Sequence, residues 1–173
     1  MKKIILFLTL ITTFLIYNEV KGEEIIIPDT AIRLRVIPNS NSALDQSIKS
    51  EVKKYLEENT YNLLKDQTNI EEARSLIKEN IPVLDQNINK LFIDNNYNLD
   101  YEINFGYNYF PEKKYRGIKY EEGYYESIVI SIGEAKGDNW WCVLFPNLCL
   151  VDLEKKNDTE YKSWVLEKIN KIF

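Results

Sequence analysis

Apolar and polar residues alternate in three stretches of the chain, and a period of two residues predicts half-buried strands. The first stretch is Ile32–Val36 and the longest is Leu99–Tyr109. The third, Tyr124–Ile132, follows a short strand expected over residues 116–120 and a turn at Gly123. We expect the last three strands to follow one another as a meander.

A spacing of three and four residues between apolar positions predicts amphipathic helices elsewhere. The first helix is expected over Ala43–Leu64, with Ser42 as its N-cap. The second should run over residues 70–94, begin at a capping box that starts at Thr68, and kink or restart at Pro82. A last helix is expected from about Thr159 to Phe173.

The predicted order β-α-α-β-β-β-α indicates an α+β fold, a mostly antiparallel sheet with helices on one face. With 173 residues, the chain is long enough for one domain, which we place at residues 23–173. Residues 133–150 have no clear periodicity, so we assign no element there.

The N-terminus has the layout of a secretory signal. Lys2 and Lys3 precede an apolar run, Ile4–Tyr17, and a polar segment follows. A helix of that length spans about 21 Å, less than the roughly 30 Å hydrocarbon core of a bilayer. Two interpretations stay open for residues 1–22: a signal peptide cleaved after Gly22, or an uncleaved membrane anchor through residues 4–17. Both place the rest of the chain across the membrane.

Composition excludes several kinds of chemistry. The chain has no histidine, which removes imidazole-based nucleophilic catalysis and His-ligated metal sites. Its net charge of −5, without a basic patch, argues against nucleic acid as a partner. We therefore expect no metal, no cofactor and no enzymatic activity, although chemistry based on carboxylates alone is compatible with the composition.

Two cysteines, Cys142 and Cys149, flank a short segment. In an exported chain this pair predicts a disulfide, and the alternative is two buried thiols. The same region holds the densest cluster of large apolar side chains. Trp140, Trp141 and Phe145 are candidates for partner binding, because such residues dominate interface energetics; the competing interpretation is that they fill the core.

Arg33 and Arg35 share one face of the first predicted strand. Together they could clamp a carboxylate or phosphate of a partner. The alternative is that they are solvated or meet acidic residues on a neighbouring strand.

Three groups of residues resemble a known family. Residues 32–37, followed by Asn39-Ser40-Asn41-Ser42 and Asp45-Gln46, resemble the N-terminal signature of the stage II sporulation protein R family of endospore-forming bacteria. Tyr109-Phe110-Pro111 with Tyr115, and then residues 123–126, resemble its central signature. Residues 133–149, which include Trp140-Trp141-Cys142, resemble its most specific one. The resemblance covers roughly residues 30–152.

This resemblance implies sporulation signalling rather than catalysis. Members are expected to be made in the forespore and exported into the space between the forespore and mother-cell membranes. There they activate a membrane-embedded aspartic protease, the sigma-E-factor processing peptidase, which removes the pro-sequence of a sigma factor in the mother cell. Transient membrane association is a further expectation. Two other hypotheses stay open: a carboxylate-dependent envelope hydrolase and a membrane-tethered protein of the spore envelope.

Overall fold

The computed structural model describes residues 30–115, 118–146, 148 and 158–172. In chain order the elements are β1 (Ile32–Ile37), α2 (Ala43–Leu64), α3 (Ile70–Asp94), β2 (Tyr101–Phe110), β3 (Lys113–Tyr115), β4 (Ile118–Tyr120), β5 (Gly123–Ile132), β6 (Trp140–Phe145) and α4 (Asp158–Ile172). The predicted α+β class and element order are confirmed. The predicted signal segment, residues 1–22, lies outside the described residues.

Four strands form one sheet in the order β2-β5-β1-β6. β5 pairs antiparallel with β2 and parallel with β1, and β6 pairs antiparallel with β1. β3 and β4 form a separate two-stranded sheet. The expected meander is therefore wrong in one respect: β2 pairs directly with β5, and the chain between them folds away as a small hairpin. Gly123 is the first residue of β5 rather than a turn.

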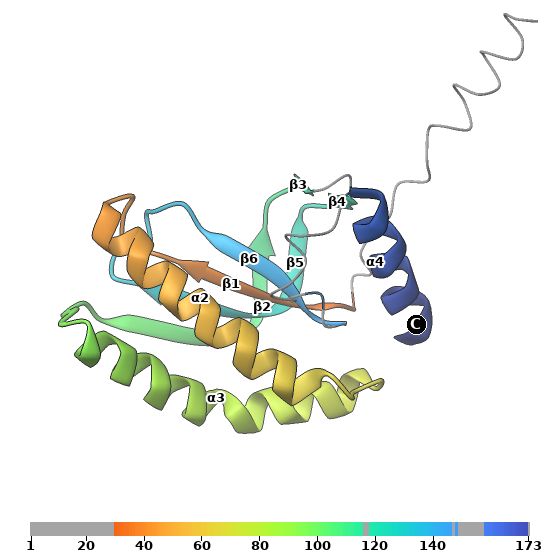
Figure 1. Cartoon of the computed structure of the whole chain (residues 1–173), viewed down its shortest axis with the longest axis horizontal. Coiled ribbons are helices and arrows are strands. Elements are labelled where there is room, and N and C mark those ends of the chain that lie inside the picture. Colours follow the sequence, from red (N-terminus) through yellow and green to blue (C-terminus); the bar gives the residue numbers. More distant parts are fainter. Residues whose placement is uncertain (1–29, 116–117, 147, 149–157, 173) are drawn as a thin grey trace, which may run out of the picture.

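The two long helices lie side by side on one face of the sheet (Figure 1). Between them and the sheet is the main core, to which β1 contributes Ile32, Leu34 and Val36, all with no exposed surface. Strand β6 supplies Leu144 and Phe145 to the same core. This burial of alternate strand positions is the physical reason that the sequence pattern located β1 correctly.

A second, smaller cluster lies on the opposite face of the sheet. It joins Val143 of β6 to Ile118 and Tyr120 of the hairpin and to Val165 of α4. Figure 1 shows α4 beside the hairpin, away from α2 and α3. Thus α2 and α3 cover one face as predicted, whereas α4 packs with the hairpin.

Local signals fix the helix ends. Ser42 caps α2 as predicted, its hydroxyl oxygen accepting from the Asp45 N–H at 3.1 Å. The cap of α3 is Asn69 rather than Thr68, and its side-chain oxygen accepts from the Glu71 N–H at 2.8 Å. α3 continues through Pro82 as one helix, so the expected restart does not occur.

Candidate functional site

Arg33 is fully buried on the face of the sheet opposite α2 and α3. Its guanidinium carbon lies 3.3 Å from the centre of the Tyr125 ring and 5.3 Å from that of Phe110. The rings of Tyr120 and Trp141 complete the surround at 6.0 and 5.7 Å. Aromatic faces attract a cation, and more strongly where water is excluded. We call these five residues the arginine cage.

The cage brings together the three segments that suggested a family. Arg33 belongs to the first segment, Phe110 and Tyr125 to the central one, and Trp141 to the last. Phe110 meets Tyr125 and Trp141 edge to face, with ring centres 6.2 and 6.1 Å apart. The central segment thus contributes two aromatic rings that pack around Arg33 of β1.

Arg35 lies at the edge of this environment, with its guanidinium carbon 5.7 Å from the centre of the Phe110 ring. It is half-buried, and burial lowers the pKa of its guanidinium below the ordinary value. With the Asn139 amide oriented toward it, the Asn139 Oδ1 accepts from Arg35 Nη2 at 2.7 Å. The two arginines for which the sequence left an anion clamp open lie in different surroundings, because Arg33 is buried among rings and only Arg35 reaches the surface.

Two loops that are far apart in sequence dock onto each other. Asn39 and Asn41, which follow β1, accept from backbone groups of the loop between β5 and β6. The Asn39 Oδ1 accepts from the Glu134 N–H at 3.0 Å, and the Asn41 Oδ1 accepts from the Asp138 N–H at 2.6 Å. The carbonyl of Asn39 also accepts from the Lys136 N–H at 3.1 Å. We call residues 38–41 and 133–139 the paired loops.

Two glycines allow the paired loops to approach this closely. A Cβ on Gly137 would overlap the carbonyl oxygen of Ser40 and would lie 2.7 Å from Pro38 Cγ. At Gly133, which has a φ of +54°, a Cβ would lie 2.5 Å from the Asn39 Oδ1. Real Cβ atoms do not occupy such positions, so both sites require glycine.

Asp45 anchors the first of the paired loops to the helix that follows it. Its carboxylate is buried and accepts from the Tyr97 hydroxyl at 2.6 Å, the Ser40 hydroxyl at 2.5 Å and the Asn39 Nδ2 at 3.0 Å. The Ser40 and Tyr97 hydroxyls lower the pKa of this carboxyl to about 2, against the opposing effect of burial. Burial and the neighbouring carboxylate raise the pKa of Tyr97.

An ion pair fixes the start of α3 to the sheet. Arg74 donates from Nε and Nη2 to the two carboxylate oxygens of Glu126, at 2.6 and 2.8 Å, and its Nη1 also bonds Glu71. The hydrogen bonds that Arg74 donates to both acids raise the pKa of its guanidinium. Such a two-point arrangement fixes orientation as well as distance. Glu126, the last residue of the central segment, therefore has a structural partner.

The adjacent tryptophans point to opposite faces of β6, as strand geometry predicts. Trp140 packs against the main core and Trp141 against the smaller cluster, and both are half-buried. Phe145 is fully buried. Of the five predicted contact residues, Arg33 and Phe145 therefore present no side chain at the surface, whereas Trp140, Trp141 and Arg35 do. Cys149 lies outside the described residues, so its pairing with Cys142 stays a prediction.

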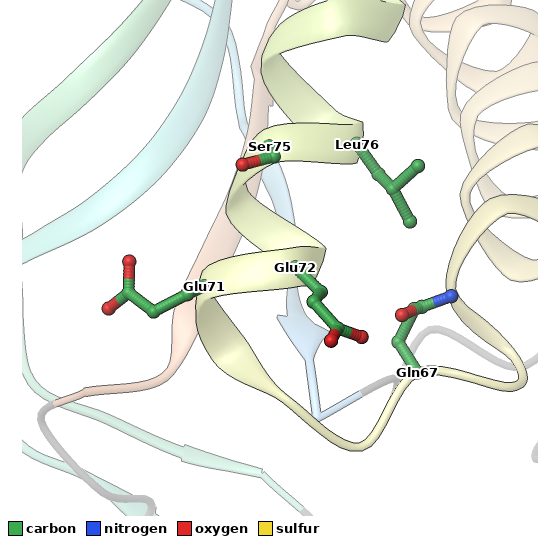
Figure 2. A pocket seen from close by; sticks show the side chains of 5 residues that line it. All are labelled: Gln67, Glu71, Glu72, Ser75 and Leu76. Atoms are coloured by element: carbon green, nitrogen blue, oxygen red, sulfur yellow. The ribbon is translucent and has the colours of Figure 1, made fainter.

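A hollow lies where the α2–α3 turn meets the start of α3 (Figure 2). It is lined by Gln67, Glu71, Glu72, Ser75 and Leu76. Glu71 points to the opposite side of the helix from Leu76 and is engaged by Arg74. The hollow therefore presents one uncommitted acid, Glu72, rather than two carboxylates that converge on a substrate.

Within the described ranges, no three His, Cys, Asp or Glu residues come together in a way that could hold a metal ion. Over the same residues, none of the helices combines the length and apolar character needed to cross a membrane.

Sequence reasoning missed several of the residues that organise this region. Asp45 enters the sequence analysis only as part of the first family segment, Asn139 only within the range 133–149, and Tyr97 not at all. The run Asn39-Ser40-Asn41-Ser42 does carry a signal, because such side chains often bond to backbone groups. Nothing in the sequence indicates that those backbone groups belong to residues nearly a hundred positions away.

The fold and its contacts define a small α+β domain in which separate sequence segments hold one another in place. Comparison with known proteins gives the family. The family model described as stage II sporulation protein R matches residues 28–155. The stage II sporulation protein R of Bacillus subtilis (strain 168) is 34% identical over 155 residues, covering 86% of this chain and 69% of the relative. The chain belongs to the stage II sporulation protein R family. No solved structure matches it.

Proposed function

We propose that this protein is an exported sporulation signal that activates the sigma-E-factor processing peptidase in the mother-cell membrane, and so triggers processing of a pro-sigma factor. The observation that carries the proposal is the family match, which spans the strand, loop and tryptophan segments together. The N-terminal arrangement of lysines and an apolar run supports export from the forespore. In this role the protein is not an enzyme and acts by binding.

The paired loops and the half-exposed part of β6 are the surface that we assign to the peptidase. Trp141 and its cross-strand neighbour Arg35 combine aromatic area with a cation on one face of β6, a composition typical of interface hot spots, and Trp140 adds aromatic area on the other face of this edge strand. The arginine cage and the glycine-dependent loop contacts hold these side chains in a fixed arrangement, which limits the entropy lost on binding. Arg33 and Phe145 are buried, so in this proposal they support the surface by packing in the interior.

We also propose the disulfide between Cys142 and Cys149. Cys142 is not a free thiol, which supports the pairing. Closing so short a loop contributes roughly 2.5 kcal/mol in the chain-entropy model. It would hold the chain after β6 close to the two tryptophans. Mass spectrometry of the exported protein, with and without a reductant, tests the bond directly.

The test of the signalling role is reconstitution in a bacterium that does not sporulate. The peptidase and the sigma-factor precursor are produced together with this protein, either complete or lacking residues 1–22. Processing only with the complete, exported form is the expected result. Absence of processing, with the protein shown to be exported and folded, would contradict the proposal.

A matched pair of variants tests the assigned surface in the same assay. Arg35→Gln should reduce processing at least tenfold, because it removes the half-buried cation of this surface. Lys65→Gln removes the same charge at the exposed end of α2 and should leave processing unchanged. Equal activity of both variants would remove Arg35 from the interface.

A further inference from the structure

Among the described residues, β2 is an edge strand with little of the usual protection against pairing. It is the outermost strand of β2-β5-β1-β6, and its pairing with β5 runs over ten residues without a bulge. Natural edge strands usually carry lysine, proline or a bulge that discourages a second strand. β2 has no lysine or proline, and its only charged residue is Glu102.

The backbone of β2 leaves a regular set of groups facing outward. The Asp100 carbonyl accepts from the Gly133 N–H at 2.8 Å, which marks the pair of residues 100 and 133 as hydrogen-bonded. Hydrogen-bonded and non-hydrogen-bonded pairs alternate in an antiparallel ladder. The N–H and C=O groups of Ile103, Phe105 and Tyr107 therefore point away from β5, toward the open edge.

Beside this edge lies a cluster of exposed tyrosines. Tyr107 is 74% exposed, Tyr124 on the neighbouring strand 72%, and Tyr109 47%. The rings of Tyr109 and Tyr124 meet edge to face with centres 5.6 Å apart. An exposed aromatic cluster next to a free strand edge indicates an interaction surface.

We propose that β2 is a self-association edge, at which a second copy of this chain adds its own β2 in antiparallel orientation. Two copies that meet about Gly106 place Tyr107 opposite Phe105 of the second copy and Tyr109 opposite Ile103. Aromatic and β-branched pairs of this kind stabilise antiparallel strands. The residues with outward backbone groups then face each other on both strands.

The polar residues of β2 fit the same pairing. In this register Asn104 lies opposite Asn108 of the second copy, so two amides meet that can bond to each other. Glu102 lies opposite Phe110, so the two glutamates do not meet across the axis. A second copy therefore pairs with the outward backbone groups of β2 without bringing like charges together. For this reason we favour a second copy over an unrelated segment.

The test is to measure the molecular mass of the purified protein, as the cell processes it, over a range of concentrations. Sedimentation should show a monomer–dimer equilibrium. Tyr107→Lys should weaken it at least tenfold, because lysine at an edge is unfavourable for strand pairing. Tyr61→Lys makes the same change at a half-exposed tyrosine on α2 and should leave the equilibrium unaltered.

A second variant separates loss of pairing from loss of folding. The N–H of Tyr107 faces the open edge, so Tyr107→Pro removes no bond to β5 and should dissociate the dimer while a thermal melt stays cooperative. Amide exchange provides an independent readout: the Ile103, Phe105 and Tyr107 amides should exchange more slowly as concentration rises. A monomer at every concentration, a dimer that survives both Tyr107 variants, or a strand of another protein bound there instead would overturn the proposal. None of these results depends on the peptidase.

Discussion

Replacing Asp45 with asparagine removes a buried charge while keeping the size and shape of the side chain. The carboxylate accepts hydrogen bonds from Tyr97 at Oδ1 and from Ser40 and Asn39 at Oδ2. An amide offers one acceptor oxygen and places an NH₂ group among these donors. Asp45→Asn therefore tests how far this one charge stabilises the paired loops.

The size of the effect follows from the pKa of the carboxyl group, which falls from an ordinary value of 3.8 to about 2 in the folded protein. A lowered folded-state pKa means that the ionised group contributes stability above pH 4, and that this contribution is lost as the pH falls through 2. A difference of nearly two units corresponds to about 2.5 kcal/mol of unfolding free energy. Because asparagine resembles the protonated acid, Asp45→Asn should cost about that much at pH 7.

Urea unfolding of the wild-type protein and of Asp45→Asn between pH 2 and pH 7 measures this difference. The gap in unfolding free energy should be constant from pH 7 to pH 5 and should nearly close by pH 2. Asp66→Asn, at an exposed position after α2, serves as the control and should change stability by less than about 0.5 kcal/mol. A gap that persists unchanged at pH 2 would refute the assignment of the stabilisation to the charge of Asp45.

Three further predictions concern packing and charge. Gly137→Ala should lower the unfolding free energy by about 2 kcal/mol or more, because its Cβ would overlap the carbonyl oxygen of Ser40. In the control Gly106→Ala the Cβ would lie 3.7 Å from its nearest neighbour, so this variant should cost less than about 1 kcal/mol. Equal losses for the two variants would contradict the role of close approach at Gly137. Glu126→Gln should cost about 1–2 kcal/mol in urea unfolding, since it breaks a partly buried two-point ion pair, and a neutral result would show that solvent screens the pair. A double-mutant cycle of Arg33→Met and Tyr125→Leu should give a coupling of about 1–2 kcal/mol, and additive effects would exclude a cation–π contribution.

The three segments that resemble the family signatures contact one another in this fold. The arginine of the first segment is enclosed by rings of the second and third, and the asparagines that follow β1 bond to the glycine-bounded loop before β6. A substitution in one segment is therefore expected to disturb the other two. This linkage explains why short stretches far apart in sequence are informative together.

The sequence by itself determined the local elements. Alternation located β1 and β2, and the three-and-four spacing located α2 with its cap at Ser42, because both signals depend on neighbours within a few residues. The absence of histidine restricted the possible chemistry without any structural information, because composition does not depend on geometry. The resemblance to the family also rested on residues read in order.

Tertiary structure alone decided which elements became neighbours. The parallel pairing of β1 with β5, the separation of the β3–β4 hairpin from the main sheet, and the location of β6 all depend on contacts between residues distant in the chain. The burial of Arg33 could not be predicted either, because the pattern assigned it to the polar face of β1, whereas rings from four other strands cover that face. Periodicity indicates that a side chain lies on the face of the strand opposite the core. It does not indicate which residues pack against that face.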